Sequence, residues 1–327
     1  MPAADYSANA DLLRVPVGGA SLHVERYGLG GRPVVLLHGL GTSSFLWRQV
    51  GPELALGGAR AFAVDLVGHG ESDRLLEASY GIAAQAEYLD RAMTALRIAS
   101  ATFVGVDLGG AVALRLAATR PDRVARLVLV NSLTPEACPG RDVDAIQSFR
   151  TMARFVIRIS RGLLRATPLL RTLLEPSVAD PSRLSSRLLA RYLAPYVGRD
   201  GAGHLLTLAR TIDDDDLADL QLETLETPTL VVHGDRDPWV DESAAEALAR
   251  TLPNARLVRL PGLSRLVPED EPATMVSLIL EHMGLRGTED GPPAEAGAVA
   301  LATGGAGSVE PSADVVATAE PDDERAV

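Results

Sequence analysis

Short apolar runs alternate along this chain with longer segments whose apolar residues recur at helical spacing. The apolar runs are residues 33–37, 61–65, 102–106, 127–130 and 229–232, with a weaker one at 257–260, and the helical segments include residues 82–96, 110–119 and 242–252. Near-continuous apolar runs are typical of strands covered on both faces, as in a parallel sheet. Strands that alternate with helices in this way predict an α/β fold with a doubly wound, mostly parallel sheet.

Two further segments depart from this alternation. Residues 12–17 and 21–27 alternate apolar and polar side chains and predict an antiparallel hairpin at the sheet edge. Between residues 133 and 225 the pattern is helical and repeatedly broken by proline. An insertion between two parallel strands emerges at their carboxyl ends, where open α/β sheets bind ligands. We therefore predict a core formed by residues 1–132 and 226–287, with a helical cap, residues 133–225, over the site.

The C-terminal segment, residues 288–327, has a different composition from the rest of the chain. It is rich in alanine, glycine, proline and acidic residues, contains no aromatic residue, and carries a net charge of −8. It cannot bury enough apolar area to offset its ordering entropy, so we expect it to be disordered. The remainder carries only −4 of the net charge of −12. A body with so little net charge does not favour nucleic-acid binding, which requires a clustered basic face.

Residue usage excludes several classes of chemistry. The single cysteine, Cys138, excludes a disulfide framework and a multi-thiolate metal site. All 31 basic residues are arginines, so no lysine can serve as a nucleophile or form a Schiff base. No apolar run reaches the roughly 18–20 residues of a membrane span, and the N-terminus lacks a secretory signal. We expect a cytoplasmic protein with no membrane association, no metal and no cofactor.

Three glycine-containing motifs follow predicted strands. They are LHGLGTSS at residues 37–44, DLVGHGESD at residues 65–73 and GVDLGG at residues 105–110. Together and in this order they resemble the motifs of the α/β-hydrolase superfamily, and the resemblance covers roughly residues 10–286. It implies a mostly parallel, doubly wound sheet with a helical cap inserted between two strands, and an active site under that cap.

The third motif has the pattern of a nucleophile elbow, a sharp turn from strand to helix that forces its central residue to a positive φ. That residue is Asp107, and aspartate tolerates such a conformation better than most residues. Esterases of the superfamily carry serine there, whereas aspartate resembles the haloalkane dehalogenase and epoxide hydrolase branch. In that branch the carboxylate attacks a saturated carbon and forms an ester. The resemblance also implies an oxyanion hole formed by the backbone N–H groups of Leu40 and Leu108.

The remaining catalytic positions fit the superfamily only in part. Asp237, in the motif VHGDRDP at residues 232–238, matches the acid. The loop that should hold the catalytic histidine, residues 261–272, has Arg265 at the matching position, with Ser264 in place of a glycine. Arginine stays charged and only donates hydrogen bonds, so it cannot activate water. It can form a bidentate ion pair with Asp107, with Asp237 or with both, so we expect an Asp–Arg–Asp arrangement.

Other residues of the predicted site carry less specific expectations. His38 and His69 occupy positions that are usually structural in the superfamily. His38, Trp239 and His204 are candidates for lining the substrate pocket, although His204 is more typical of a core or surface residue. The positions at which dehalogenases place halide-binding residues hold Leu108 and Leu40, which disfavours a dehalogenase. The candidates for the cap tyrosines of epoxide hydrolases are Tyr192 and Tyr196.

Three functions remain open. We favour a non-hydrolytic elimination, cyclisation or rearrangement of a small, largely apolar biosynthetic intermediate, with Asp107 as acid or base and Arg265 holding an anionic group. The second is hydrolysis of an epoxide, halide or ester by an Asp107 nucleophile with a substitute base. The third is a non-catalytic receptor or scaffold for a small ligand, in which the Asp–Arg pair is only structural.

Two charged segments bear on partners. Arginines recur at helical spacing at Arg150, Arg154, Arg158, Arg161 and Arg165. They predict one helix face, which is either solvated or a docking face for an acyl-carrier protein or another anionic partner. The acidic run at residues 213–216 predicts a solvated turn and helix start, not a metal site. A homodimer is a further alternative.

Overall fold

In the part of the chain that the structure describes, the protein forms one mixed sheet of eight strands. The computed structural model describes residues 10–75, 79–141, 171, 174–197, 200–213 and 215–285. The strands are β1 (Asp11–Pro16), β2 (Ser21–Tyr27), β3 (Arg32–Leu37), β4 (Ala59–Val64), β5 (Ala101–Val106), β6 (Val124–Val130), β7 (Thr229–Gly234) and β8 (Ala255–Leu260). Their order is β1-β2-β4-β3-β5-β6-β7-β8. Strands β1 and β2 pair antiparallel at one edge, β2 pairs antiparallel with β4, and all later neighbours are parallel, which confirms the predicted architecture.

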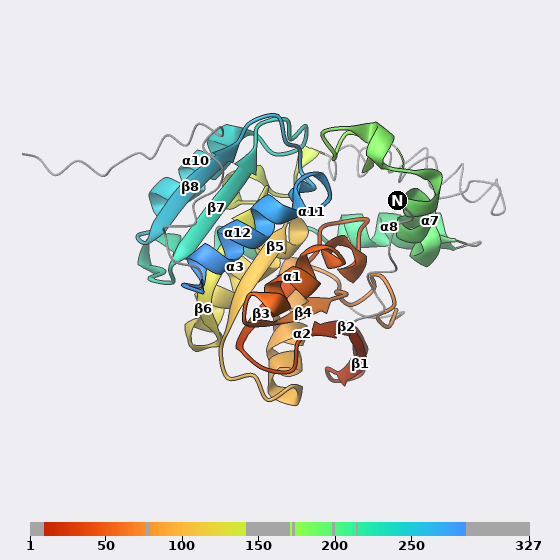
Figure 1. Ribbon diagram of the computed structural model, residues 1–327, viewed down its shortest axis with the longest axis horizontal. Helices are drawn as coiled ribbons and strands as arrows, with labels where there is room; N and C mark the ends of the chain where they lie inside the picture. Colours follow the sequence, from red (N-terminus) through yellow and green to blue (C-terminus); the bar gives the residue numbers. More distant parts are fainter. Residues whose placement is uncertain are drawn as a thin grey trace, which may run out of the picture.

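Helices cover both faces of the sheet, and this is why its central strands are almost purely apolar. All six residues of β5 are buried, as the near-continuous apolar run predicts. The core helices are α1 (Val50–Leu56), α2 (Ile82–Ala95), α3 (Leu108–Thr119), α10 (Glu242–Thr251), α11 (Val267–Asp270) and α12 (Pro272–His282). Helices α1 and α12 pack together on one face, and α2 packs against α3 on the other (Figure 1). Within the described ranges, every helix is too short or too polar to cross a bilayer.

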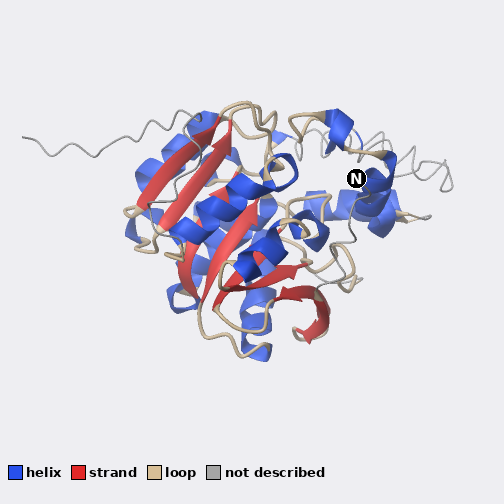
Figure 2. Cartoon of the chain, in the orientation of Figure 1, coloured by secondary structure: helices blue, strands red, loops and turns tan. Residues whose placement is uncertain are grey.

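Helical elements fill the described part of the insertion between β6 and β7. They are η4 (Pro135–Ala137), η5 (Pro181–Arg183), α7 (Ser186–Leu193), η6 (Ala194–Tyr196), α8 (Gly201–Arg210), α9 (Asp215–Ala218) and η7 (Leu222–Thr224). Figure 2 shows α7 and α8 as a separate group to one side of the sheet. The division into core and cap at residues 133 and 225 stays a prediction. The arginines from Arg150 to Arg165 and the tail, residues 288–327, lie outside the described residues.

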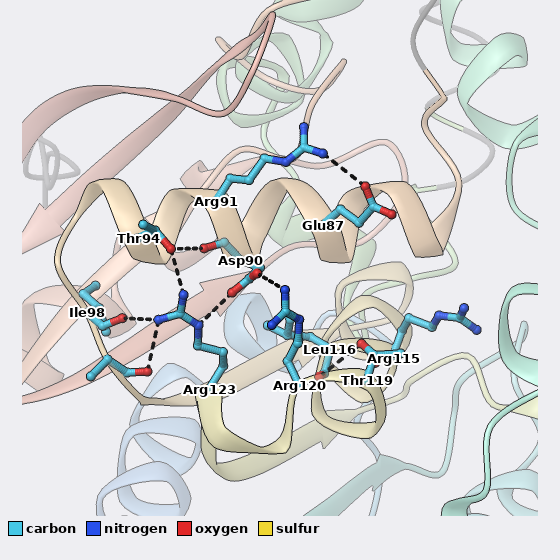
Figure 3. A network of polar contacts seen from close by, with 11 residues as sticks. Glu87, Asp90, Arg91, Thr94, Ile98, Arg115, Leu116, Thr119, Arg120 and Arg123 are labelled. Atoms are coloured by element: carbon cyan, nitrogen blue, oxygen red, sulfur yellow. Dashed lines mark hydrogen bonds and ion pairs between the residues drawn. The ribbon is translucent and has the colours of Figure 1, made fainter.

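Ion pairs join α2 to the chain that follows α3 (Figure 3). Asp90 of α2 accepts from Arg123 at 2.7 Å and from Arg120 at 3.1 Å, and Arg123 also donates to the Thr94 hydroxyl at 2.7 Å. Arg120 precedes η3 (Pro121–Arg123), the turn that leads into β6, and Arg123 is the last residue of that turn. These contacts join α2 to the turn that follows α3, the helix that begins at the elbow.

Candidate active site

Asp107 lies in a sharp turn between β5 and α3. Its φ of 54° and ψ of −120° place it in the left-handed half of conformational space, as the elbow motif predicts. The turn is held by backbone hydrogen bonds, from the Asp107 N–H to the Val130 carbonyl at 3.1 Å and from the Gly110 N–H to the Asp107 carbonyl at 3.0 Å. The side chain is thereby fixed at the carboxyl end of the central strand. The residue is only 1% exposed.

Gly109 allows α3 to approach β3 closely enough to form this turn. A Cβ at residue 109 would lie 2.6 Å from the His38 carbonyl oxygen and 2.7 Å from backbone atoms of Leu37. Such contacts are with backbone, which cannot rotate away as a side chain could. A glycine is therefore required where the elbow helix crosses the neighbouring strand.

Gly109→Ala is expected to lower the free energy of unfolding by about 1–3 kcal/mol, because the added methyl overpacks the junction of α3 and β3. Urea denaturation followed by circular dichroism measures the change. Gly203→Ala in α8 is the matched control, since no neighbouring atom lies within 4 Å of the position that its methyl would take, and it should raise stability by about 0.5–1 kcal/mol. Equal effects of the two substitutions would contradict the proposed close approach.

One carboxylate oxygen of Asp107, Oδ2, lies at one of the two N–H groups predicted to form the oxyanion hole. The Leu40 N–H donates to Asp107 Oδ2 at 2.8 Å. The loop that presents this donor is fixed by the Thr42 hydroxyl, which donates to the Gly39 carbonyl at 2.8 Å. Leu108, the other predicted donor, is the buried first residue of α3. The structure therefore brings Leu40 to the elbow carboxylate as the sequence predicts.

The His38 ring joins two loops of the site. Its ring is fully buried, with Nδ1 against the Gly39 carbonyl at 2.9 Å and Nε2 accepting the Leu66 N–H at 3.1 Å. Burial lowers the pKa of this imidazole, which favours the neutral form. Both ring nitrogens are used to join the loop after β3 to the turn after β4. His38 therefore has a structural role in the oxyanion loop, and its place in the lining of a substrate pocket stays a prediction.

Arg265 faces the other oxygen of Asp107. Its Nη2 forms an ion pair with Asp107 Oδ1, and the arginine is only 4% exposed. Asp107 thus receives the Leu40 N–H on one oxygen and a guanidinium on the other. Removing two charges from water is costly, and a pair so deeply buried is stable only because each charge compensates the other. The predicted pairing of Arg265 with the elbow aspartate is found in the structure.

Asp237 lies beside this pair, at the carboxyl end of β7. Its Oδ2 accepts from Asn131 Nδ2 at 2.8 Å, and its Oδ1 accepts the Trp239 N–H at 2.9 Å. Burial raises the pKa of the Asp237 carboxyl above its ordinary value, although the positive charge of Arg265 and these hydrogen bonds act in the opposite direction. The three charged residues that the sequence singles out therefore interact with one another.

Asn131 is a site residue that the motifs do not indicate. It directly follows β6 with a φ of 42°, its amide holds Asp237, and its Oδ1 accepts the Gly234 N–H at 3.1 Å. Asparagine is enriched at positive φ, so its position directly after a predicted strand was the available signal. Asn131 ties the ends of β6 and β7 together and orients the acid.

All six histidines lie in the described residues, and each makes its polar contacts away from Asp107. Besides His38, these contacts are His23 with Glu25, His69 with the Val67 carbonyl, His204 with the Gly68 carbonyl, His233 with Asn131 and His282 with the Pro228 carbonyl. Within the described ranges, no group of three or more His, Cys, Asp or Glu side chains is placed to hold a metal ion.

The two remaining pocket candidates lie where the cap meets the core. His204 of α8 bonds to the Gly68 carbonyl at 2.6 Å and lies between the rings of Tyr80 and Tyr196, so it joins the cap to the turn after β4. Trp239 donates its indole N–H to the Ser177 hydroxyl at 3.0 Å. Trp239 also lines a cavity of about 430 Å³ that contains Cys138. That Trp239 and His204 line the substrate pocket stays a prediction.

The two cap tyrosines differ in their surroundings. The Tyr192 hydroxyl donates to Glu269, and Glu269 in turn pairs with Arg48 at 2.8 Å. Burial raises the pKa of Tyr192 well above its ordinary value. The Tyr196 hydroxyl is buried and has no hydrogen-bond partner among the described residues. That either tyrosine serves as a cap tyrosine of the epoxide hydrolase kind stays a prediction.

Comparison with known proteins gives the same fold and a consistent set of relatives. A family model described as the alpha/beta hydrolase fold matches residues 32–272. A haloalkane dehalogenase of Mycobacterium marinum is 34% identical over 235 residues, which cover 69% of this chain and 75% of the relative. The solved haloalkane dehalogenase of Bradyrhizobium elkani is 27% identical, with a TM-score of 0.70 over 84% of this chain and 98% of that one. The epoxide hydrolase CorEH, at 20% identity, shares the fold with a TM-score of 0.72 over 84% of this chain and 99% of that one.

Proposed function

Since the chain belongs to the α/β-hydrolase fold family, we propose that it is an enzyme that converts a small, largely apolar organic molecule by elimination, cyclisation or rearrangement, without hydrolysis. The observation that carries this proposal is the buried ion pair between Asp107 and Arg265 at the elbow. By the resemblance of its loop to the superfamily pattern, Arg265 is predicted to stand where that pattern has an imidazole. The same pair supplies a carboxylate that can move a proton and a cation that can hold a developing negative charge.

Hydrolysis through an Asp107 ester requires a base that removes a proton from water. Arg265 cannot act as that base because it stays protonated. The six histidines make their polar contacts elsewhere, as described above. Burial of Asp107 and Arg265 also limits the access of bulk water to the reacting carboxylate. These features favour a reaction that needs proton transfer but no attacking water.

Elimination from a β-hydroxy ketone illustrates the chemistry. Asp107 takes the proton from the carbon next to the carbonyl, and the electron pair of that C–H bond forms the carbon–carbon double bond through an enolate. Arg265, which has five N–H donors, pairs with Asp107 and holds the enolate oxygen at the same time. The β-hydroxyl then leaves with the proton that Asp107 returns, as water, and an enone remains. Asp107 ends the cycle as a carboxylate.

The second candidate is an Asp107-nucleophile hydrolase in which Asp237 is the substitute base. The relatives at 34% and 27% identity are named haloalkane dehalogenases, and the Leu40 N–H already binds the oxygen of Asp107 that would not attack. Burial raises the pKa of Asp237, which makes its carboxylate a stronger base. Leu40 and Leu108, at the halide-binding positions of dehalogenases, favour an epoxide or ester over a halide as the substrate.

An assay with two arms separates these candidates. In one arm, 4-hydroxy-4-phenylbutan-2-one is incubated with the protein and enone formation is followed by ultraviolet absorbance. In the other, styrene oxide, 1-bromobutane and p-nitrophenyl butyrate are tested for turnover and for a mass increase on Asp107. We expect elimination that Asp107→Asn and Arg265→Met each reduce by at least about 100-fold, and no sustained hydrolysis.

Two other results of this assay would support a different function. Sustained hydrolysis that Asp107→Ala removes would contradict the proposal and support the second candidate. Tight binding of these compounds without any conversion would support the receptor alternative.

The proposed enzyme acts in the cytoplasm on a small molecule and uses no cofactor, as the sequence predicts. Docking of an acyl-carrier protein depends on the arginines from Arg150 to Arg165, which lie outside the described residues.

A further inference from the structure

The segment that carries Arg265 is bonded to the cap on both sides of this residue. The Ser264 hydroxyl donates to the Pro176 carbonyl at 2.9 Å, and the Leu266 N–H donates to the Ser177 carbonyl at 2.8 Å. We name residues 264–270 the arginine segment and residues 176–183 the cap segment. The backbone next to Arg265 therefore follows the position of the cap segment and not only that of the sheet.

One buried carboxylate joins these two segments. Asp270 is 3% exposed, and both of its carboxylate oxygens accept the Ala179 N–H, at 2.9 and 3.0 Å. Its Oδ2 also accepts the Ser264 N–H at 3.3 Å. In addition, the Asp270 carbonyl accepts from Arg183 Nη1 at 2.6 Å. The carboxylate thus bridges the residue that precedes Arg265 and the middle of the cap segment.

The neighbouring residue fixes the far end of the arginine segment. Glu269 forms a bidentate pair with Arg48, which follows η2 (Ser44–Trp47), and accepts from Tyr192 of α7. A bidentate pair restricts orientation as well as distance. With Glu269 held in this way, the freedom left to the segment lies around Ser264 and Arg265. Asp270 and the Ser264 hydroxyl are the side-chain groups whose contacts restrict that freedom.

We propose that Asp270 is a positioning residue that holds Arg265 against Asp107 and makes this ion pair depend on the cap segment. Without the carboxylate, the N–H groups of Ala179 and Ser264 lose their shared acceptor inside the protein. Buried donors left unsatisfied are costly, so the two segments separate until water reaches them. Arg265 then leaves Asp107 for part of the time. The consequence for catalysis rests on the proposed function, whereas the positioning itself does not.

Modification of arginine by phenylglyoxal tests the positioning without any substrate. The full-length protein is treated with the reagent, and modification of each arginine is followed by peptide mass spectrometry. In the wild type, Arg265 should react slowly because it is buried and paired. In Asp270→Asn, an NH2 group replaces one of the two acceptor oxygens and faces a backbone N–H. We expect Arg265 to react about tenfold faster, which corresponds to the loss of one buried hydrogen bond. Arg123, which is bonded to Asp90 and Thr94, is the internal reference and should not change.

Two further variants keep the proposal open to contradiction. Glu271→Gln removes the same charge from the next residue, an exposed side chain that makes no capping hydrogen bond, and should leave Arg265 unchanged. Arg183 is an exposed residue that donates to the Asp270 carbonyl. Arg183→Gln removes this donor and should speed the modification of Arg265 about threefold, even if Asp270→Asn does not fold. An unchanged Arg265 rate in both Asp270→Asn and Arg183→Gln would overturn the proposal. So would an equal acceleration at Arg123, which would indicate general loosening. Absence of elimination activity would count against the proposed function alone.

Discussion

Arg265→Met is expected to lower the free energy of unfolding by about 3–5 kcal/mol, the usual cost of removing one partner from a buried ion pair. Methionine keeps much of the length of arginine but removes the guanidinium, so Asp107, which is 1% exposed, loses the cation that compensates its charge. The Leu40 N–H still donates to Asp107 Oδ2, but one hydrogen bond does not replace a cation. Urea denaturation at neutral pH measures the change.

The double variant Asp107→Asn/Arg265→Met is the control for this prediction. It removes the buried charge that Arg265→Met leaves behind, so it should recover most of the lost stability, because replacing both partners of a buried pair is often close to neutral. The penalty of Arg265→Met should also shrink as the pH falls, since a protonated carboxyl no longer carries an unpaired charge. A penalty below about 1 kcal/mol, the value of an exposed ion pair, would mean that water reaches Asp107 and would remove the basis of the proposed function.

The sequence predicts most of the elements that position the site. The central strands are apolar on both faces, and this pattern is local enough to read from the chain. The elbow, the oxyanion loop and the acid follow predicted strands, and the carboxyl ends of parallel strands meet at one edge of a sheet. Asp107, Leu40 and Arg265 are therefore brought together as expected. The start of α3 differs: residues 110–119 are predicted and Leu108 is the first helical residue, because the elbow continues directly into the helix.

Contacts between distant segments could not be predicted in this way. The bond from Asp270 to Ala179 joins residues 91 positions apart, and the pair of Arg48 with Glu269 joins residues 221 positions apart. Neither contact has a periodicity or a motif, since each depends on how segments that are distant in the sequence pack against one another. His38 shows a related limit. From the sequence, a histidine in the loop near the nucleophile can be either a pocket residue or a structural one. Its structural role is visible only in the fold, where the His38 ring accepts the Leu66 N–H.

Arg265→His is expected to give the protein a hydrolytic activity toward styrene oxide, at a rate about 10²–10⁴ above that of the wild type, because it supplies the general base that, under the proposed function, the elbow does not have. An imidazole at this position can take the proton of a water that attacks the ester on Asp107, and the adjacent Asp237 carboxylate can orient the ring. The rate should rise with pH as the imidazole loses its proton, since only the neutral form accepts one. Turnover is measured by diol formation, and intact mass spectrometry follows the ester on Asp107. In the wild type any such ester should persist, because Arg265 cannot activate water.

Two matched variants decide whether the new activity has this origin. Arg265→Gln removes the guanidinium without adding a base, so it should accumulate the Asp107 ester and release it no faster than the wild type. Asp107→Ala/Arg265→His keeps the base but lacks the nucleophile, so it should form neither ester nor diol. Equal turnover by the histidine and glutamine variants would show that relief of the ion pair, and not proton transfer, limits hydrolysis. In that case Asp237 would be the base, the second candidate function would replace the first, and the buried pair would act as a restraint on a competent hydrolase.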